Sequence, residues 1–263
     1  MHVAFYEPAG TDAFVASPAT AGPWSARAQH GGPPSALAAR AIERHELDER
    51  QRLARVAVDI LRPVPVGKVT VRVRTARPGR RVALLEAIME ADGQEVLHAR
   101  GWRIALSPGE PPAASPAPGP PGALEVPDER PLPAFFDGRL AGYLSAIEWR
   151  FLSGGNFNGR ERARVWARPR IPLIPGEEPS PMGRALLIAD SGSGVSAVLD
   201  PARFLFINVD LTVALQRDPA GEWLLLDAAS AIGDQGTGLA ETVLSDVAGQ
   251  CGRGLQTLLV APR

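Results

Sequence analysis

The sequence is poor in the residues that build metal and thiol sites. Its 263 residues include one cysteine, Cys251, and four histidines. A single cysteine excludes an intramolecular disulfide and a cysteine-cluster metal site. So few histidines argue against a histidine-rich metal centre. We therefore expect no metal and no cofactor, and a chemistry that uses neither a metal cage nor a thiol.

The chain also lacks a net charge of either sign and any long hydrophobic run. It has 28 Lys and Arg against 29 Asp and Glu, a net charge of −1. That balance argues against a protein whose main task is to grip nucleic acid or an anionic membrane. The apolar runs are far shorter than the roughly 20 residues a bilayer requires. The opening MHVAFYEPAG has neither the basic nor the apolar region of a secretion signal. We expect a cytoplasmic protein without nucleic-acid or membrane partners.

Proline is abundant, and its positions divide the chain. Ten of the 26 prolines fall within 107–133, in SPGEPPAASPAPGPPGALEVPDERPLP. Proline breaks helices and cannot sit in a central strand. This stretch therefore reads as an extended linker. The sequence predicts an N-terminal unit at 1–106, a linker at 107–133 and a C-terminal unit at 134–263.

The first unit reads as a loop, one helix and then strands. Pro33 and Pro34 suit the first turn of a helix whose body spans Ser35–His45. Nearly every side of this helix carries small apolar residues, which indicates that other structure encloses it. Turn residues separate the strand-like segments that follow. These segments are Leu53–Leu61, Lys68–Thr75, Arg81–Ala91 and Gln94–Ala105.

The second unit repeats this order. Its helix is predicted at Met182–Asp190. The strands are predicted at Glu148–Leu152, Arg162–Arg168, Phe204–Gln216, Glu222–Ile232, Gly238–Val247 and Gly254–Val260. VAVDILRPVPVGKV in the first unit is similar to INVDLTVALQRDPAGEW in the second. A duplication predicts an α+β fold of two tandem units, each a helix wrapped by a curled antiparallel sheet. Chance similarity between two β-rich halves is the alternative.

Two places could carry chemistry beside the helices. Gly31 and Gly32, which follow His30, allow another group to approach the backbone closely, and N–H groups at a helix start favour a developing oxyanion. An ordinary loop-to-helix turn would look the same. Asp190 follows an apolar helical run, where a buried carboxylate would be costly. A catalytic role would explain it, and so would an exposed helix end.

Two polar strand residues complete the candidates. Asn208 and Asp210 share one face of an alternating strand. An asparagine can hold a water by accepting and donating hydrogen bonds. Asp210 has a counterpart in Asp59, which indicates a shared structural role. Gln256 is polar in an otherwise apolar strand, so it is either a satisfied sheet residue or part of a site.

Four segments resemble the TesB-like acyl-CoA thioesterases of the double hot-dog type. They are HGGPPSALAARAIE, LIADSGSG, FINVDLTVALQRDPAGEW and LQTLLV. The resemblance implies that Asp190 activates a water held by Asn208 and Gln256. It also implies that the segment His30, Gly31 and Gly32 contacts the thioester or the pantetheine. Asn208 departs from the threonine usual at its position.

The expected activity is hydrolysis of acyl-CoA to coenzyme A and a carboxylic acid, without an acyl-enzyme. Two alternatives stay open. A hot-dog hydratase or dehydratase would use a histidine, here His30, with a carboxylate. A non-catalytic acyl-CoA binding protein would keep the tunnel and lose turnover. Two fused units imitate a dimer within one chain, with helices packed side by side and sheets joined at an edge. We expect further association to a homodimer or homotetramer.

Overall fold

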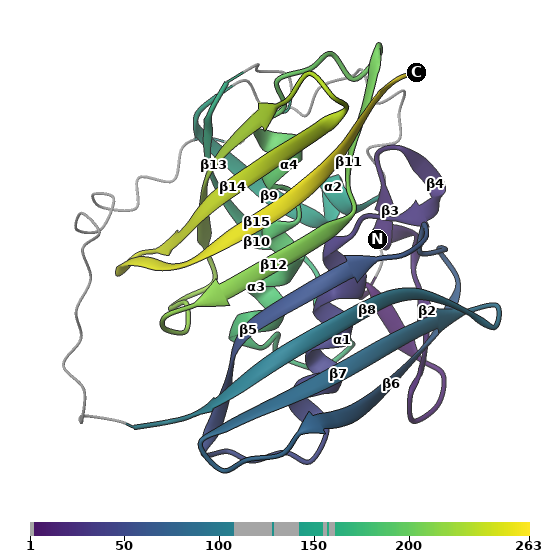
Figure 1. Ribbon diagram of the computed structural model, residues 1–263, viewed down its shortest axis with the longest axis vertical. Coiled ribbons are helices and arrows are strands. Elements are labelled where there is room, and N and C mark those ends of the chain that lie inside the picture. The colour runs from purple at the N-terminus through teal and green to yellow at the C-terminus, as the bar shows by residue number, and fades with distance from the viewer. Residues whose placement is uncertain (1–2, 108–127, 129–141, 155–156, 158–160) are drawn as a thin grey trace.

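A broad curved sheet dominates the computed structural model, and the helices lie against one face of it (Figure 1). The structure describes residues 3–107, 128, 142–154, 157 and 161–263. Of the predicted linker, all but residues 107 and 128 lie outside the described residues. Helices that combine the length and the apolar character of a membrane span do not occur in this described part of the chain.

The N-terminal half consists of short strands, one long helix and four long strands. The elements are β1 (Tyr6–Pro8), β2 (Ala13–Ala16), the 3-10 turn η1 (Pro18–Thr20), β3 (Ala21–Gly22), β4 (Ser25–Gln29), α1 (Gly32–Arg44), β5 (Gln51–Ile60), β6 (Lys68–Arg77), β7 (Val82–Ala91) and β8 (Gln94–Ala105). The predicted helix and four strands are confirmed. The expected opening loop was wrong, because β1 pairs with β2 and β2 with β6 at the sheet edge. These strands are too short to show alternation in the sequence.

The C-terminal half has the same long strands with more helical turns. Its elements are α2 (Tyr143–Ala146), β9 (Ile147–Ser153), β10 (Ala163–Pro169), α3 (Pro181–Ala189), α4 (Gly192–Val195), β11 (Phe204–Asn208), β12 (Asp210–Leu215), β13 (Leu224–Ile232), β14 (Thr237–Asp246) and β15 (Gly249–Pro262). The strand predicted at Phe204–Gln216 is broken after Asn208 into β11 and β12, and both parts pair with β15.

The two halves share one sheet and one core. The strand order is β1-β2-β6-β7-β8-β5-β12-β15-β14-β13-β10-β9, and antiparallel pairing of β5 with β12 joins the halves. Behind that junction α1 packs against α3. Nine of the thirteen residues of α1 are buried, as expected for an enclosed helix. A single cluster of buried apolar residues includes side chains from both halves.

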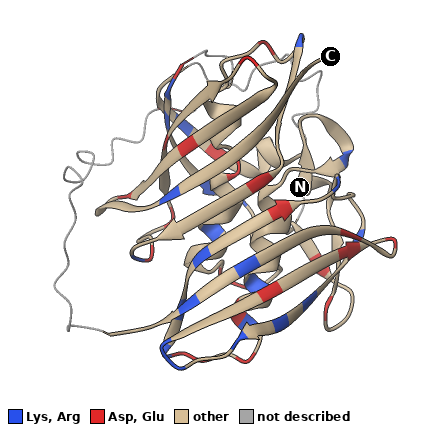
Figure 2. Cartoon of the chain, in the orientation of Figure 1, with Lys and Arg blue, Asp and Glu red and all other residues tan. Residues whose placement is uncertain are grey.

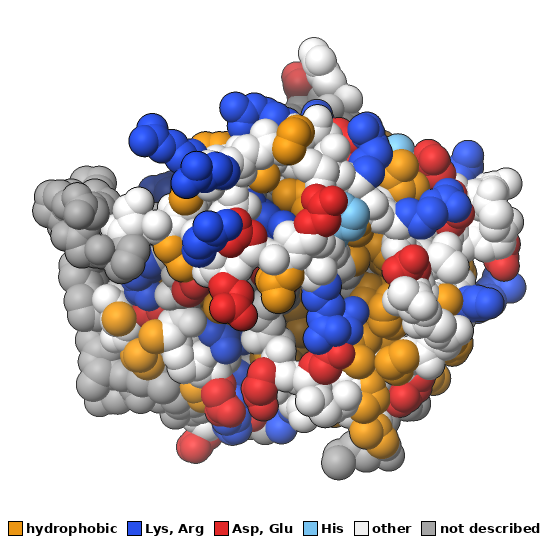
Figure 3. Space-filling model, turned by 90° about the horizontal axis from the view of Figure 1, so that it is seen from below, with side chains coloured by type: hydrophobic (Ala, Val, Ile, Leu, Met, Phe, Trp, Pro, Cys, Tyr) orange, Lys and Arg blue, Asp and Glu red, His pale blue; other side chains and the backbone are white. Residues whose placement is uncertain are grey.

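Charged side chains form cross-strand pairs on the sheet of the N-terminal half. The charged residues of β6 are basic, those of β7 are acidic, and β8 carries both signs (Figure 2). Arg100 pairs with Glu86 at 3.0 Å, and Arg72 pairs with Glu90 on neighbouring strands. Such cross-strand pairs suit a solvated sheet face. Seen from below, the molecule also carries both signs of charge interspersed with apolar side chains (Figure 3).

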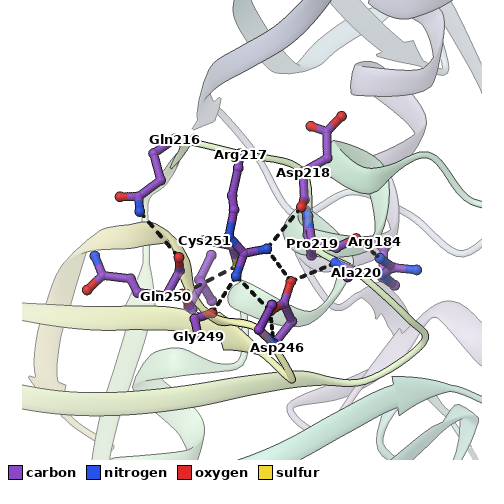
Figure 4. Close-up of polar contacts among 12 residues, drawn as sticks. Arg184, Gln216, Arg217, Asp218, Pro219, Ala220, Asp246, Gly249, Gln250 and Cys251 are labelled. Atoms are coloured by element: carbon purple, nitrogen blue, oxygen red, sulfur yellow. Dashed lines mark hydrogen bonds and ion pairs between the residues drawn. The ribbon is translucent and has the colours of Figure 1, made fainter. Parts of the chain in front are cut away.

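An ion pair between the buried Asp246 and the partly exposed Arg217 connects two turns of the C-terminal half (Figure 4). Asp246, which is fully buried, accepts hydrogen bonds from both terminal nitrogens of Arg217 at 2.5 and 2.7 Å. It also accepts from the main-chain N–H groups of Ala220 and Ala248 at 2.6 and 2.7 Å. The loop after β12 is thereby tied to the turn between β14 and β15.

Candidate active site

Two cavities flank the packed helices, and their linings differ in chemistry. One, of about 570 Å³, lies between the C-terminal part of α1 and the start of α3 and carries charged side chains of both signs. Burial raises the pKa of Glu43 there to about 6. The other, of about 520 Å³, is mainly apolar and is lined by His30, Gly31, Asp190 and Asn208. The second cavity brings four of the predicted site residues together, and it is the candidate active site.

Asp190 lies at the centre of the site. It follows the last residue of α3, and its residue surface is only 4% exposed. Burial excludes the alternative of a solvent-exposed helix end. Asn208 Nδ2 donates to Asp190 Oδ1 at 2.8 Å, and His30 Nδ1 lies 2.9 Å from Asp190 Oδ2. Both carboxylate oxygens are therefore held, and each keeps lone pairs for one more partner.

The hydrogen bonds fix the orientation of the Asn208 amide. Its Nδ2 faces Asp190 Oδ1 and also the main-chain oxygen of Asp210, 3.0 Å away. Both partners are acceptors, so the NH₂ group must point toward them and Oδ1 must point elsewhere. Asn208 lines the cavity. Its carbonyl oxygen can therefore accept a hydrogen bond from a water beside Asp190.

His30 Nδ1 has two neighbours that make opposite demands on it. Asp190 Oδ2, at 2.9 Å, requires a proton on Nδ1, whereas the Gly32 N–H, at 3.2 Å, requires a lone pair. We assign the proton to the carboxylate contact, because it is shorter and because a charged acceptor makes the stronger hydrogen bond. In the neutral imidazole, this assignment places the lone pair on Nε2, which can then accept a hydrogen bond.

The two glycines after His30 are required by close contacts. A Cβ atom on Gly31 would lie 2.8 Å from each carboxylate oxygen of Asp190. A Cβ atom on Gly32 would lie 2.2 Å from the main-chain oxygen of Leu187 in α3. Gly31 lines the cavity, and its N–H has no acceptor within the described residues. The start of α1 and the end of α3 therefore approach this closely only with glycine at position 32, whereas a side chain at position 31 would have to displace the Asp190 carboxylate.

Gln256 reaches the same turn from β15 but does not line the cavity. Its side chain is 1% exposed. Nε2 donates to the main-chain oxygen of Asp190 at 2.9 Å, and Oε1 accepts from Ser193 N–H at 2.9 Å. Gln256 therefore binds the backbone on both sides of the break between α3 and α4. Its contacts fix the position of Asp190.

Tyr143 is a site residue that sequence reasoning missed. It is fully buried, and its ring stacks on the His30 ring with centroids 3.7 Å apart and planes 9° apart. Its hydroxyl donates to the main-chain oxygen of Leu187 at 2.7 Å. Tyrosine occurs only twice in the chain, but nothing in the local sequence pattern marks Tyr143.

The remaining reactive groups do not serve the site. Asp210 accepts from the N–H of Thr257 at 2.6 Å and lies opposite Asp59 across the β5–β12 junction. Burial raises the pKa of the Cys251 thiol to about 12, so it stays protonated. Groups of three or more His, Cys, Asp or Glu side chains that could hold a metal ion are not found in the described part of the chain.

Comparison with known proteins identifies the family. Residues 20–104 match the family model of the acyl-CoA thioesterase N-terminal domain, and residues 111–260 match that of the C-terminal domain. No curated protein matches the sequence.

Several solved structures share the fold. A putative thioesterase II from Thermobifida fusca has 17% identity and a TM-score of 0.74, with 98% of this chain and 96% of that chain covered. A conserved protein with a hot dog fold from Alicyclobacillus acidocaldarius has 17% identity and a TM-score of 0.71, with 97% and 95% covered. The acyl-CoA thioesterase II TesB2 from Mycobacterium marinum has 16% identity and a TM-score of 0.66, with 98% and 95% covered. The chain has a hot-dog fold and belongs to the acyl-CoA thioesterase family of thioester hydrolases.

Proposed function

We propose that this enzyme hydrolyses acyl-CoA by direct attack of water, releasing coenzyme A and a carboxylic acid. One observation carries the proposal: a buried carboxylate, Asp190, is held between His30 and Asn208 in the wall of a mainly apolar cavity. Such a carboxylate can take a proton from a water, and the apolar wall can take an acyl chain.

The proposed reaction proceeds without a covalent enzyme intermediate. A water hydrogen-bonded to Asn208 Oδ1 gives one proton to Asp190, and its oxygen adds to the thioester carbonyl carbon. The unpaired N–H of Gly31 stabilises the oxyanion, assisted by the helix start at Gly32. The carbon–sulfur bond then breaks. The thiolate leaves with the electron pair and takes up a proton, which regenerates the Asp190 carboxylate.

The lining of the cavity supports an uncharged acyl group as the substrate moiety. Among the described lining residues, the acidic and basic side chains are Asp190, Arg62 and His30. The larger apolar side chains in the lining are Trp24, Ile60, Leu61, Val64, Leu144, Phe157, Leu205, Phe206, Ile207 and Val209. Burial of an acyl chain against these groups favours binding by about 0.8 kcal/mol for each CH₂.

We also propose that the chain is a duplicated, double hot-dog protein with units at 1–106 and 134–263 joined by the proline-rich segment. An offset of 151 residues supports this (210 − 59), because Asp59 then maps onto Asp210, and these residues face each other across the junction. The same offset relates Gly32, which abuts Leu187, to Gly183, whose Cβ would approach the oxygen of Ala36 at 4.0 Å.

We also propose that the enzyme assembles into a homodimer or homotetramer. The outer face of the C-terminal half of the sheet exposes Leu239, Leu255 and Leu259 by 40%, 42% and 46%. Leu239 and Leu255 lie on the paired strands β14 and β15. Exposed apolar side chains gathered on one sheet face favour association.

A hydratase or dehydratase is the second candidate, because the His30–Asp190 contact of 2.9 Å supplies a histidine with a carboxylate. Thiol release from an acyl-CoA chain-length series, run beside hydration of an enoyl-CoA, separates the two. Release of free coenzyme A without hydration supports the thioesterase. Hydration supports the second candidate, and binding without either reaction supports a non-catalytic acyl-CoA binding protein.

Asp190→Asn tests the role of the carboxylate. The amide cannot take the proton of the water, so we expect kcat to fall about 10²–10⁴-fold with little change in KM. Thiol-release kinetics and a thermal melt measure the effect on turnover and on the fold. Asp92→Asn is the control, since Asp92 sits at φ 50° in the β7–β8 turn, a conformation asparagine tolerates. Full activity of Asp190→Asn would overturn the assignment.

A further inference from the structure

The main-chain oxygen of Leu187 lies where three segments of the site meet. The start of α1 approaches it through Gly32, and the hydroxyl of Tyr143 donates to it at 2.7 Å. In a continuing helix this oxygen would accept from the N–H of Ser191. Here the N–H of Ser191 bonds instead to the oxygen of Ile188 at 3.0 Å, because α3 tightens at its end. Tyr143 therefore supplies the donor that the helix end lacks.

The same tyrosine also holds the histidine. Its ring lies parallel to the His30 imidazole, 3.7 Å between centroids. Stacking fixes the plane in which the imidazole lies, and with it the direction in which Nδ1 points. The Tyr143 hydroxyl is also 3.0 Å from Ser191 Oγ, next to Asp190 in the sequence. Burial raises the pKa of Tyr143, which keeps the hydroxyl protonated as a donor.

One side chain thus supports both members of the His30–Asp190 contact. We propose that Tyr143 is a positioning residue for the reaction: it caps Leu187, stacks on His30, and so fixes the distance between the imidazole and the carboxylate. The proposal rests on the proposed function for its kinetic consequence. It does not require Tyr143 to touch substrate, and the residues lining the cavity do not include it.

Two substitutions separate the two contacts of Tyr143. Tyr143→Phe keeps the stacked ring and removes the hydroxyl, whereas Tyr143→Leu removes both. We expect kcat for thiol release to fall modestly in Tyr143→Phe and about 10²-fold in Tyr143→Leu, because a displacement of about 1 Å in a catalytic group has an effect of this size. KM should stay close to the wild-type value in both variants, since neither changes the cavity wall. A purely structural role would lower the melting temperature without this split between kcat and KM.

A second measurement does not depend on turnover. Ring-nitrogen NMR of the four histidines reports whether His30 Nδ1 carries the proton shared with Asp190, with His30→Gln used to assign the signal. We expect the Nδ1 proton signal in wild type and in Tyr143→Phe, and its loss in Tyr143→Leu. If the wild-type enzyme releases no thiol from any acyl-CoA, the proposed function fails, and this measurement still decides the role of Tyr143.

Trp166→Phe is the matched control for loss of buried aromatic volume. Trp166 is 2% exposed on β10, outside the cluster of core residues that contains Tyr143. We expect it to lower stability while leaving kcat and the His30 signal unchanged. Should Tyr143→Leu fail to fold, Tyr143→Phe carries the kinetic test. Wild-type kcat together with an unchanged His30 signal in the folded Tyr143 variants would overturn the proposal.

Discussion

At the scale of single residues, the position of the Asp190 carboxylate depends on the lack of a side chain at Gly31. Gly31 adopts ordinary helical angles, φ −67° and ψ −20°, so its backbone does not require glycine. What requires glycine is the Asp190 carboxylate, whose two oxygens would each lie 2.8 Å from an added Cβ. A substitution at Gly31 therefore tests one contact without backbone strain.

Gly31→Ala should displace the Asp190 carboxylate from His30 and Asn208. We expect kcat to fall about 10–100-fold, because a catalytic group held out of place by a fraction of an ångström to 1 Å loses this much. Steady-state thiol release and a thermal melt are the measurements. Gly67→Ala is the control, since a Cβ there meets nothing within 4 Å. Wild-type kcat in Gly31→Ala would show that the Asp190 carboxylate can shift without loss of activity, which would contradict this prediction.

The sequence was most informative about single residues whose type conflicted with their surroundings. Asp190 could be predicted to be a special residue because a carboxylate after an apolar helical run is costly if buried. Gln256 stood out for the same reason, but its partners could not be predicted. They are main-chain atoms brought to it by the pairing of distant strands. Tyr143 could not be found at all, because a buried tyrosine conflicts with nothing nearby.

At the scale of elements, the break between α3 and α4 places Asp190 beside the cavity. α3 ends at Ala189 and α4 begins at Gly192. Gln256 holds the two sides of the break, at Asp190 O and Ser193 N. Gly192 permits this close approach, since a Cβ there would lie 2.4 Å from Thr242 Oγ1. The helix predicted at Met182–Asp190 is confirmed by α3 to within one residue at each end, but α4 was not predicted, because a break set by contacts with β15 has no local cause.

Gln256→Leu should disturb this break. It removes the hydrogen bonds to two buried main-chain groups, at a cost of about 1–3 kcal/mol for each group left unsatisfied. We expect a lower melting temperature and a kcat reduced along with it, because Asp190 loses its anchor. Gln250→Leu on the same strand is the control: there the main-chain oxygen, rather than the side chain, accepts from Gln216 (Figure 4). A Gln256→Leu enzyme with wild-type kcat and stability would contradict this role.

At the scale of the whole molecule, the halves should unfold as one unit. β5 and β12 pair at the centre of a continuous sheet, and α1 packs on α3. The sequence predicted two units that imitate a dimer, with helices side by side and sheets joined at an edge, and the pairing of β5 with β12 and the packing of α1 on α3 confirm this junction. The sequence did not predict which strands join the sheets, because the two strands lie about 150 residues apart in the chain (210 − 59 = 151). A perturbation in one half should therefore be felt in the other.

Asp246 offers such a perturbation. Burial alone would raise the pKa of this carboxyl, but Arg217 and the N–H groups of Ala220 and Ala248 outweigh burial and hold the pKa below its usual range. The folded state therefore binds the Asp246 proton more weakly than the unfolded chain. The stabilisation is present above the unfolded pKa of about 3.9 and is lost as the pH falls from there through the folded value.

Asp246→Asn leaves the partly exposed Arg217 without its carboxylate and weakens the hydrogen bonds to a charged acceptor, and we expect a loss of about 1–3 kcal/mol at pH 7. The difference from wild type should shrink as the pH falls below about 4. Amide hydrogen exchange locates the loss. If the halves unfold together, the slowest-exchanging amides of β7 and β8 in the N-terminal half should lose protection by the same free energy as those of β14. Asp218→Asn is the control, because its exposed pair with Arg52 contributes less than about 1 kcal/mol. If the amides of β14 lost protection while those of β7 and β8 kept theirs, the halves would unfold independently despite their common sheet.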